Sequence, residues 1–246
     1  MSTSEDESNL IVSKFGGTSL ATAESVARVC EIIKTDPSRK IVVVSAPGRR
    51  YRGDAKITDL LVSISDRFAS IPGGEVVCDY VLSRGEYLMA QVLSKALGHE
   101  FVDIEKTGVI AFDNKGEFDL ELSRKNFAKF RGKNIVVPGF YGVMPNGAVK
   151  TFPRGGSDIT GAIMANIADA TLYENWTDVD GVYNSDPDEN ANAKCFDSLS
   201  YDEVEILGKA GASVLHHDCI KFVRAKNIPL VVRNTFNVSA RGTLIS

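Results

Sequence analysis

Four absences limit the classes of protein to which this 246-residue chain can belong. No apolar run approaches the ~20 residues that are needed to cross a bilayer. The first residues, MSTSEDESNL, are acidic and polar, whereas a secretory signal begins with basic residues followed by an apolar segment. The sequence therefore predicts a cytoplasmic protein without a membrane partner.

A basic excess is also absent. The chain has 28 Lys and Arg residues against 32 Asp and Glu residues, a formal net charge of −4. Nucleic-acid-binding domains usually carry a basic face that neutralises phosphates, so we expect no nucleic-acid partner. The composition, 43% apolar and 24% charged, is typical of a globular protein and excludes a disordered or collagen-like chain.

The fourth absence is a cysteine or histidine pattern that would build a disulfide framework or a metal site. The four cysteines are widely spaced without a C-x-x-C motif, and we interpret them as reduced, mostly buried thiols. His216 and His217 are adjacent, so on a helix they point ~100° apart and cannot share a metal ion. We predict no protein-built metal site. The glycosylation sequons at Asn175 and Asn237 are interpreted as chance matches, because no secretory signal is present.

After a polar, acidic tail at residues 1–9, which we expect to be disordered, short apolar runs alternate with longer amphipathic stretches. Buried strands are expected at residues 10–15, 40–45, 108–112, 134–140, 171–176 and 229–233. Helices are expected at residues 22–34, 57–69, 75–97, 123–130, 158–169, 200–210 and 214–226. Asn146-Gly147 predicts a type I′ hairpin between residues 141–143 and 148–152, and Ser200 with Glu203 forms a capping box.

This alternation predicts an α/β protein, a three-layer α/β/α sandwich with a mainly parallel central sheet and one inserted antiparallel hairpin. Neither a linker nor an internal repeat occurs, so we expect one domain of two lobes over residues 10–246. In such sheets ligands gather at the carboxyl ends of the strands. The loops that follow the strands are therefore the candidate sites.

The first expected strand leads directly into Lys14-Phe15-Gly16-Gly17-Thr18-Ser19 and then into a helix. Gly16 and Gly17 allow the backbone to approach a ligand closely, the helix N-terminus favours an anion, and Lys14 adds a positive charge. We interpret this segment as a phosphate-binding loop, although it matches neither the Walker A pattern nor a G-x-G-x-x-G fingerprint. A tight turn beside a solvated lysine is the alternative.

Two further loops carry polar residues. Ser45 closes the second strand and Thr58 opens the following helix, where these hydroxyls either hold a small polar ligand or simply cap a helix. Arg154-Gly155-Gly156-Ser157-Asp158 is the strongest motif, because an arginine fork beside a Gly-Gly turn at a helix start is suited to bind a carboxylate. In the alternative interpretation Ser157 or Asp158 only caps the helix.

A later strand ends in the segment Trp176-Thr177-Asp178-Val179-Asp180-Gly181-Val182-Tyr183. Aspartates at this position can hold Mg²⁺ through water or accept a hydrogen bond from a ribose, and Tyr183 can flank an adenine. Asx turns account for the same residues without a ligand.

The motifs KFGGTS, SRGE, RGGSD, TDVDGVY and GASVLH follow one another along the chain. With them, residues 10–245 resemble the catalytic domain of the aspartate kinases, which are members of the amino-acid kinase family. The resemblance implies the amino-acid kinase fold, ATP and Mg²⁺ as cofactors, and phosphorylation of the side-chain carboxylate of L-aspartate. The product would be 4-phospho-L-aspartate, on the route to lysine, threonine and methionine. The resemblance also makes a homodimer possible.

The resemblance further implies roles for individual residues. The catalytic candidates are Lys14, which would hold the transferring phosphoryl group together with Gly16 and Gly17, and Asp158, which would organise Lys14. Aspartate would contact Thr18, Ser45, Thr58, Glu86, Arg154 and Ser157, with Arg154 on its α-carboxylate and Glu86 near its ammonium group. ATP would contact Thr177, Asp178, Tyr183 and Ser213. Residues 10–150 would form mainly the amino-acid-binding lobe and residues 151–246 mainly the nucleotide-binding lobe.

Three positions depart from the family pattern. Ser213 replaces a lysine that faces the nucleotide phosphates, Asp188 stands where an arginine is usual, and Pro153 stands where a glycine is usual. The lost cations weaken the attraction for ATP, so a non-catalytic ligand-binding or partner subunit is an alternative, as is a sibling kinase for another small carboxylate. Relatives carry ACT domains beyond this region, whereas the chain stops at Ser246, and we expect no inhibition by lysine or threonine.

Arg154→Lys tests the assignment of the carboxylate-binding arginine. The substitution keeps the charge but removes the bidentate fork, so aspartate binding should weaken by ~1.5–3 kcal/mol. Calorimetric titration of aspartate into both proteins measures the difference. An unchanged affinity would contradict the assignment.

Overall fold

The computed structural model describes residues 9–153, 155–185, 187, 190, 192–209, 215 and 217–246. Its centre is an eight-stranded sheet with the strand order β3-β4-β2-β1-β7-β9-β10-β8. The strands are β1 Ile11–Phe15, β2 Ile41–Val44, β3 Glu100–Phe101, β4 Ile135–Pro138, β7 Leu172–Thr177, β8 Ser198–Leu199, β9 Leu230–Asn234 and β10 Thr243–Ile245. Neighbouring strands are parallel except β9 and β10, which run antiparallel. A separate hairpin pairs β5 (Tyr141–Val143) with β6 (Val149–Thr151).

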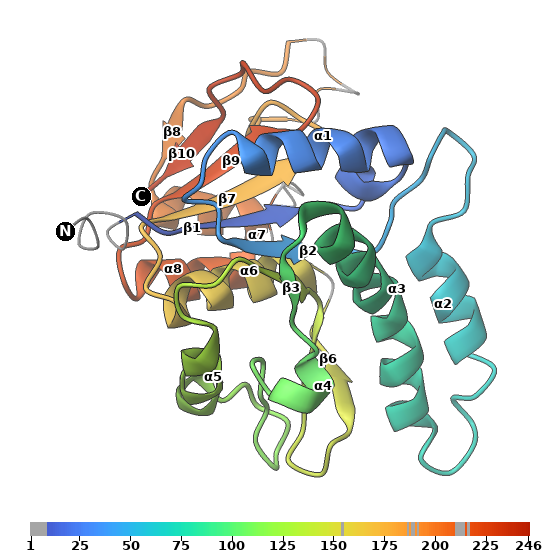
Figure 1. Cartoon of the computed structure of the whole chain (residues 1–246). Helices are drawn as coiled ribbons and strands as arrows, with labels where there is room; N and C mark the ends of the chain where they lie inside the picture. Colours follow the sequence, from blue (N-terminus) through green and yellow to red (C-terminus); the bar gives the residue numbers. More distant parts are fainter. Residues whose placement is uncertain are drawn as a thin grey trace.

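Helices cover both faces of this sheet (Figure 1). On one face α1 (Ala23–Lys34) and α3 (Gly74–Leu97) supply apolar side chains to the core, and α2 (Ile57–Ser65) packs along α3. On the other face lie α5 (Leu120–Phe127), α6 (Gly156–Ile167), α7 (Tyr201–Lys209) and α8 (Ile220–Arg224). Shorter helical segments are α4 (Ile104–Thr107), η1 (Thr18–Leu20), η2 (Ala128–Phe130) and η3 (His217–Cys219). The predicted three-layer sandwich with a mainly parallel sheet is confirmed.

Side chains alternate between the two faces of the sheet, as they must in a strand. In β2, Ile41 and Val43 pack in the core beneath α6, whereas Val42 and Val44 pack beneath α1 and α3. The same alternation in β1 directs Lys14 toward α6, where it meets Asp158. A charged side chain is thus placed at the carboxyl end of a strand that is otherwise buried on both faces.

Local capping fixes the starts of two helices. In α1 the Thr22 side chain accepts a hydrogen bond from the Ser25 backbone N–H at 3.2 Å, and the Ser25 hydroxyl accepts one from Thr22 N–H at 3.0 Å. The capping box predicted for Ser200 and Glu203 is confirmed by hydrogen bonds of 2.7 and 3.3 Å. These side chains satisfy N–H groups that have no partner within the helix.

Two predictions of local structure are wrong. Residues 108–112 do not join the central sheet, because Ala111 and Phe112 make only isolated bridges, to Val143 of the hairpin and to Phe118. The hairpin turn is not type I′, which requires positive φ at both central residues. The Gly147 N–H bonds to the Met144 carbonyl at 2.9 Å, which makes Pro145 and Asn146 the central residues, and proline fixes φ at a negative value.

Some sequence predictions concern features outside this architecture. In the part of the chain that the structure describes, no helix is both long and apolar enough to cross a membrane. Cys30 and Cys219 are buried, Cys78 is half-buried, Cys195 is exposed, and none of them is in a disulfide. The acidic tail, apart from Asn9, lies outside the described residues.

Candidate functional site

A cavity of about 680 Å³ opens at the carboxyl ends of β1 and β2, between these strands, α2, α3 and the start of α6. This is the edge of a parallel sheet where ligands are expected. The cavity brings together predicted site residues from distant parts of the chain: Lys14, Gly17, Thr18, Ser45, Thr58, Glu86, Ser157, Asp158 and Asp178.

An ion pair between Lys14 of β1 and Asp158 of α6 forms one wall of the cavity. Lys14 Nζ lies 2.6 Å from Asp158 Oδ1, and the two side chains are only 9% and 12% exposed. Asn175 of β7 completes the cluster: its Oδ1 accepts a hydrogen bond from Lys14 Nζ at 3.3 Å, and its Nδ2 donates one to Asp158 Oδ1 at 3.0 Å. Both charged groups are therefore fixed in position, with the lysine bordering open space.

The loops after β1 and β2 are held together by close backbone contact. Gly48 N–H donates to the Gly17 carbonyl at 2.8 Å. A Cβ added to Gly17 would lie 2.9 Å from the Ala46 carbonyl oxygen, and one added to Gly48 would lie 2.6 Å from the Gly17 carbonyl carbon. Only glycine fits at these positions, so the loop that carries Thr18 and the loop that follows Ser45 form one continuous surface.

Phe140 lies in the cavity wall with a backbone conformation that bulky residues rarely adopt, at φ 77°. Its N–H donates to Thr160 Oγ1 at 3.0 Å, and its carbonyl accepts from Phe152 N–H at 2.8 Å, which holds the residue in place. Strain of this kind costs on the order of 1–3 kcal/mol and is concentrated at functional sites. Sequence analysis missed Phe140, because no local sequence pattern indicates that a phenylalanine will adopt a positive φ.

Glu86 of α3 reaches the cavity from the opposite side. A Cβ on Gly85 would lie 2.6 Å from the Ala46 Cβ, so the missing side chain lets α3 approach the loop after β2. Glu86 is only 4% exposed, and its Oε2 has no hydrogen-bond partner among the described residues. Burial raises the pKa of Glu86 from its ordinary value of 4.5 to about 7, although a hydrogen bond from the Ala46 backbone opposes the shift.

Other predicted residues lie elsewhere. Gly16, Thr177 and Tyr183 do not line this cavity. The Gly16 N–H donates to the Trp176 carbonyl at 2.9 Å, the Thr177 hydroxyl donates to Asp178 Oδ1 at 3.1 Å, and Tyr183 bridges to Cys195. The predicted arginine Arg154, the nucleotide residue Ser213 and the departure at Asp188 lie outside the described residues, as does His216.

Sequence reasoning also misses Asn175, whose local sequence indicates only a glycosylation sequon. Asn175 is 1% exposed and makes both hydrogen bonds of the Lys14 cluster. Two adjacent polar residues, Glu174 and Asn175, inside a buried strand were the available signal, since buried polar groups require partners. Arg49 and Lys56, two further cations in the cavity wall, were missed as well.

The cavity therefore offers both signs of charge to a ligand. Cations line it at Lys14, Arg49 and Lys56, and the buried Glu86 oxygen is available to a positively charged group. No cluster of three or more His, Cys, Asp and Glu residues in the described part of the chain could hold a metal ion by itself. Such a site is suited to a small molecule that carries an ammonium and an anionic group, next to a phosphate.

Comparisons with known proteins identify the family of this chain. The family model described as "Amino acid kinase family" matches residues 9–234. Aspartokinase 3 of Bacillus subtilis is 33% identical over 95% of this chain and 63% of its own length, and an aspartokinase of Helicobacter pylori is 32% identical over 96% and 59%. This chain thus spans about three fifths of the length of these relatives.

Solved structures show the same fold. The aspartate kinase of Clostridium acetobutylicum has a TM-score of 0.83 and 38% identity, over 96% of this chain and 62% of that one. Aspartokinase III of Escherichia coli, solved with aspartate and ADP, has a TM-score of 0.85 at 24% identity, over 96% and 64%. At that lower identity the likeness concerns the fold alone.

Glu86→Gln tests the burial of the Glu86 carboxyl. Because its pKa is raised on folding, ionisation of Glu86 lowers the stability of the native state as pH rises from 4.5 through about 7. The amide cannot ionise, so the variant should gain up to about 3 kcal/mol of unfolding free energy relative to wild type between about pH 5 and about pH 8. Urea denaturation at both pH values measures this gain. Glu75→Gln, an exposed position on the same helix, is the control, and an equal pH dependence in the two variants would contradict the shift.

Proposed function

This chain belongs to the amino acid kinase family, and from that membership we propose that it transfers the γ-phosphoryl group of ATP to the side-chain carboxylate of L-aspartate. The product is 4-phospho-L-aspartate, an acyl phosphate for amino-acid biosynthesis. This substrate is supported by aspartokinases that are more than 30% identical to this chain over nearly its whole length.

The observation that carries the proposal is the unpartnered Glu86 oxygen, which borders the same cavity as the Lys14–Asp158 pair. A buried carboxylate oxygen without a partner is unfavourable until a cation reaches it, and the ammonium group of an amino acid is such a cation. The substrate's negative groups then lie toward the cationic side of the cavity. Ser45, Thr58 and Ser157 line the space between and offer hydroxyl groups.

The reaction needs little acid–base chemistry. A side-chain carboxylate has an ordinary pKa of ~3.9 and is ionised at neutral pH, so no general base has to activate it. One carboxylate oxygen forms a bond to the γ-phosphorus while the bond between that phosphorus and the β,γ-bridging oxygen breaks, and ADP leaves with the electron pair. The task of the protein is to bring two anions together in line.

Lys14 performs the central part of that task. Its ammonium group neutralises charge on the transferring phosphoryl group, and the Asp158–Asn175 pair fixes its position before the substrates arrive. Gly16 and Gly17 lie beside it in the loop after β1, and because the Gly16 N–H is bonded to the Trp176 carbonyl, the other N–H groups of this loop would be the ones that favour phosphate oxygens. Asp158 acts here as a positioning residue.

Mg²⁺ usually binds to nucleotide phosphates with the help of only one or two protein carboxylates. Asp178 follows β7 and lines the cavity, so it fits this need. When bound, the ion reduces the charge of the phosphates. The nucleotide itself would extend from Lys14 toward Thr177 and Tyr183, in keeping with a nucleotide lobe at residues 151–246 and an amino-acid lobe at residues 10–150.

A homodimer is also proposed. The helices α2 and α3 pack side by side and leave large apolar side chains uncovered, including Leu60 and Ile64 on α2 and, one turn apart on α3, Leu88 and Val92. Leu88 and Val92 are 59% and 54% exposed. Exposed apolar patches of this kind mark interfaces, and a second copy of the chain provides a self-complementary partner.

Activity measurements test the kinase proposal. We expect ADP release that depends on aspartate, and hydroxylamine should trap the acyl phosphate as a hydroxamate. Lys14→Met should lower kcat by about 10²–10³-fold, the usual loss when a charge-stabilising group is removed from a phosphoryl-transfer site. Lys95→Met, at an exposed position in the last turn of α3, should leave kcat unchanged. ADP release that does not require aspartate, or that occurs without hydroxamate formation, would contradict the proposal.

Light scattering after gel filtration tests the homodimer. Wild type should have twice the mass of the chain, and the double substitution Leu88→Glu with Val92→Glu should give the single-chain mass because it buries like charges at the interface. Lys95→Glu, just beyond the patch, serves as the control. If wild type has the single-chain mass when the protein concentration is on the order of tens of micromolar, the dimer is contradicted.

A further inference from the structure

Arg84 of α3, the arginine of the SRGE motif, lies at the centre of a cluster that has no part in the proposed reaction. Its guanidinium carbon lies 4.1, 4.5 and 5.7 Å from the ring centroids of Tyr80, Tyr87 and Tyr141. Its Nη2 donates a hydrogen bond to Glu105 Oε1 of α4 at 2.5 Å. We call these residues the Arg84 cluster. Because aromatic and acidic contacts act on the same guanidinium, the cluster links α3, α4 and β5.

Hydrogen bonds within α3 fix the orientation of this guanidinium. The fully buried Ser83 hydroxyl accepts from Arg84 Nη2 at 2.8 Å and from Nε at 3.1 Å, and it donates to the Tyr80 carbonyl at 2.7 Å. The Arg84 side chain is only 20% exposed. A long side chain that is held by so many contacts has lost most of its rotamer freedom. Arg84 therefore acts as a rigid cross-link and not as a solvated surface charge.

The position of Arg84 on α3 couples the cluster to the cavity at the carboxyl ends of β1 and β2, which we call the kinase cavity. Successive residues of an α-helix are ~100° apart, so Arg84 and Glu86 extend from nearly opposite sides of the same turn. Between them Gly85 abuts the loop after β2, where a Cβ on this glycine would lie 2.6 Å from the Ala46 Cβ. A rotation of α3 that the cluster prevents would therefore move Glu86 within the kinase cavity.

Tyr141 couples the same cluster to another wall of the kinase cavity. Tyr141 is fully buried and directly follows Phe140, the residue with φ 77° in the cavity wall. The Phe140 ring packs on the start of α6, because a Cβ on Gly156 would lie 2.7 Å from Phe140 Cδ2. The Tyr141 hydroxyl has no hydrogen-bond partner among the described residues. Contacts of the Tyr141 ring, including the one with Arg84, therefore hold this side chain.

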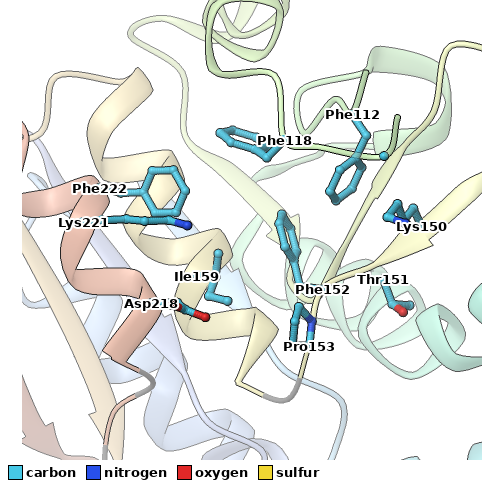
Figure 2. Close-up of a pocket in the computed structure, with 11 residues that line it drawn as sticks. Phe112, Phe118, Lys150, Thr151, Phe152, Pro153, Ile159, Asp218, Lys221 and Phe222 are labelled. Atoms are coloured by element: carbon cyan, nitrogen blue, oxygen red, sulfur yellow. The ribbon is translucent and has the colours of Figure 1, made fainter. Parts of the chain in front are cut away.

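The hairpin that begins at Tyr141 is fastened to α3 at a second point. Thr151 Oγ1 of β6 donates a hydrogen bond to Asp79 Oδ1 of α3 at 2.6 Å. The next residue, Phe152, packs against Phe112 with ring centroids 5.0 Å apart, and Figure 2 shows the Phe152 ring pointing toward Phe112. The hairpin is thus supported from both sides. A displacement of α3 would be transmitted to the start of the hairpin instead of being absorbed by it.

From these contacts we propose that Arg84 is a positioning residue for the amino-acid substrate, whose cluster holds Glu86 and Phe140 at the separation that fits L-aspartate. The inference rests on the proposed function, in which Glu86 receives the ammonium group. Arg84 does not line the described part of the kinase cavity, so it acts through other residues. Lys14 lies on β1, outside the cluster, so Arg84 should govern aspartate binding and not phosphoryl transfer.

Steady-state kinetics of Arg84→Met test the proposal, because methionine keeps an aliphatic side chain but removes the charge and the guanidinium fork. The KM for aspartate should rise about tenfold or more, while kcat and the KM for ATP stay within about threefold of wild type, the pattern of weakened ground-state binding. Calorimetric titration with aspartate should show the same loss of affinity. Arg28→Met, at an exposed position on α1, is the matched control and should change none of these values.

Milder substitutions keep the test decisive if Arg84→Met folds poorly. Arg84→Lys keeps a cation for Glu105 and for the rings, so it should restore most of the aspartate affinity that Arg84→Met loses. Glu105→Gln removes only the ion pair and should raise the KM for aspartate less than Arg84→Met does. Combining Glu105→Gln with Arg84→Met should cause no further loss, because both substitutions remove the same contact.

The outcomes distinguish the role of Arg84 from the proposed function. An aspartate KM that is unchanged in Arg84→Met, in a wild-type protein that turns over aspartate, would overturn the role of Arg84 alone. Equal losses of affinity for aspartate and ATP would also overturn it, because they indicate a general loss of structure. Absence of aspartate-dependent turnover in wild type would instead contradict the proposed function, and the role of Arg84 with it.

Discussion

The Lys14–Asp158 ion pair is the interaction on which the site depends. Taking two charges out of water is costly, and the pair is stable only where further hydrogen bonds compensate. Asn175 supplies them, and the register of β1 with β7 sets Lys14 directly beside Asn175. The first turn of α6 must then bring Asp158 over both strands. These contacts hold β1, β7 and the start of α6 together at the place where phosphoryl transfer is proposed.

The same register builds a second buried polar cluster on the opposite face of the sheet. Ser13 pairs with Glu174, and the Ser13 hydroxyl donates to Glu174 Oε2 at 2.8 Å. Arg39 donates two further hydrogen bonds to the Glu174 carboxylate, at 2.8 and 3.0 Å, and Trp176 Nε1 donates a fourth at 3.0 Å. Glu174 is therefore fully partnered, whereas Glu86 is left with a free oxygen at the cavity. This contrast separates a carboxylate that serves the fold from one that is available to a ligand.

Elements with a strong local period were predictable from the sequence. The β-branched runs of β1, β2, β4 and β9, the aromatic-rich run of β7, the amphipathic helices and the Ser200 capping box are all local patterns, and the parallel sheet follows from the alternation of strands and helices. The strands β3, β8 and β10 have only two or three residues, too few for a period, and exist because neighbouring strands offer hydrogen bonds. Residues 108–112 have the composition of a strand, but they bridge to the hairpin and not to the central sheet. No local sequence signal distinguishes these two pairings.

The candidate site divides in the same way. Motifs such as Lys14-Phe15-Gly16-Gly17 determined which residues carry charge and where the backbone must turn tightly, because those properties reside in the residues themselves. Their convergence on one cavity, the role of Asn175, the strained backbone of Phe140 and the raised pKa of Glu86 were decided only by tertiary structure. Each of these depends on a neighbour that is distant in sequence, since desolvation and hydrogen bonding are set by what packs around a group once the chain has folded.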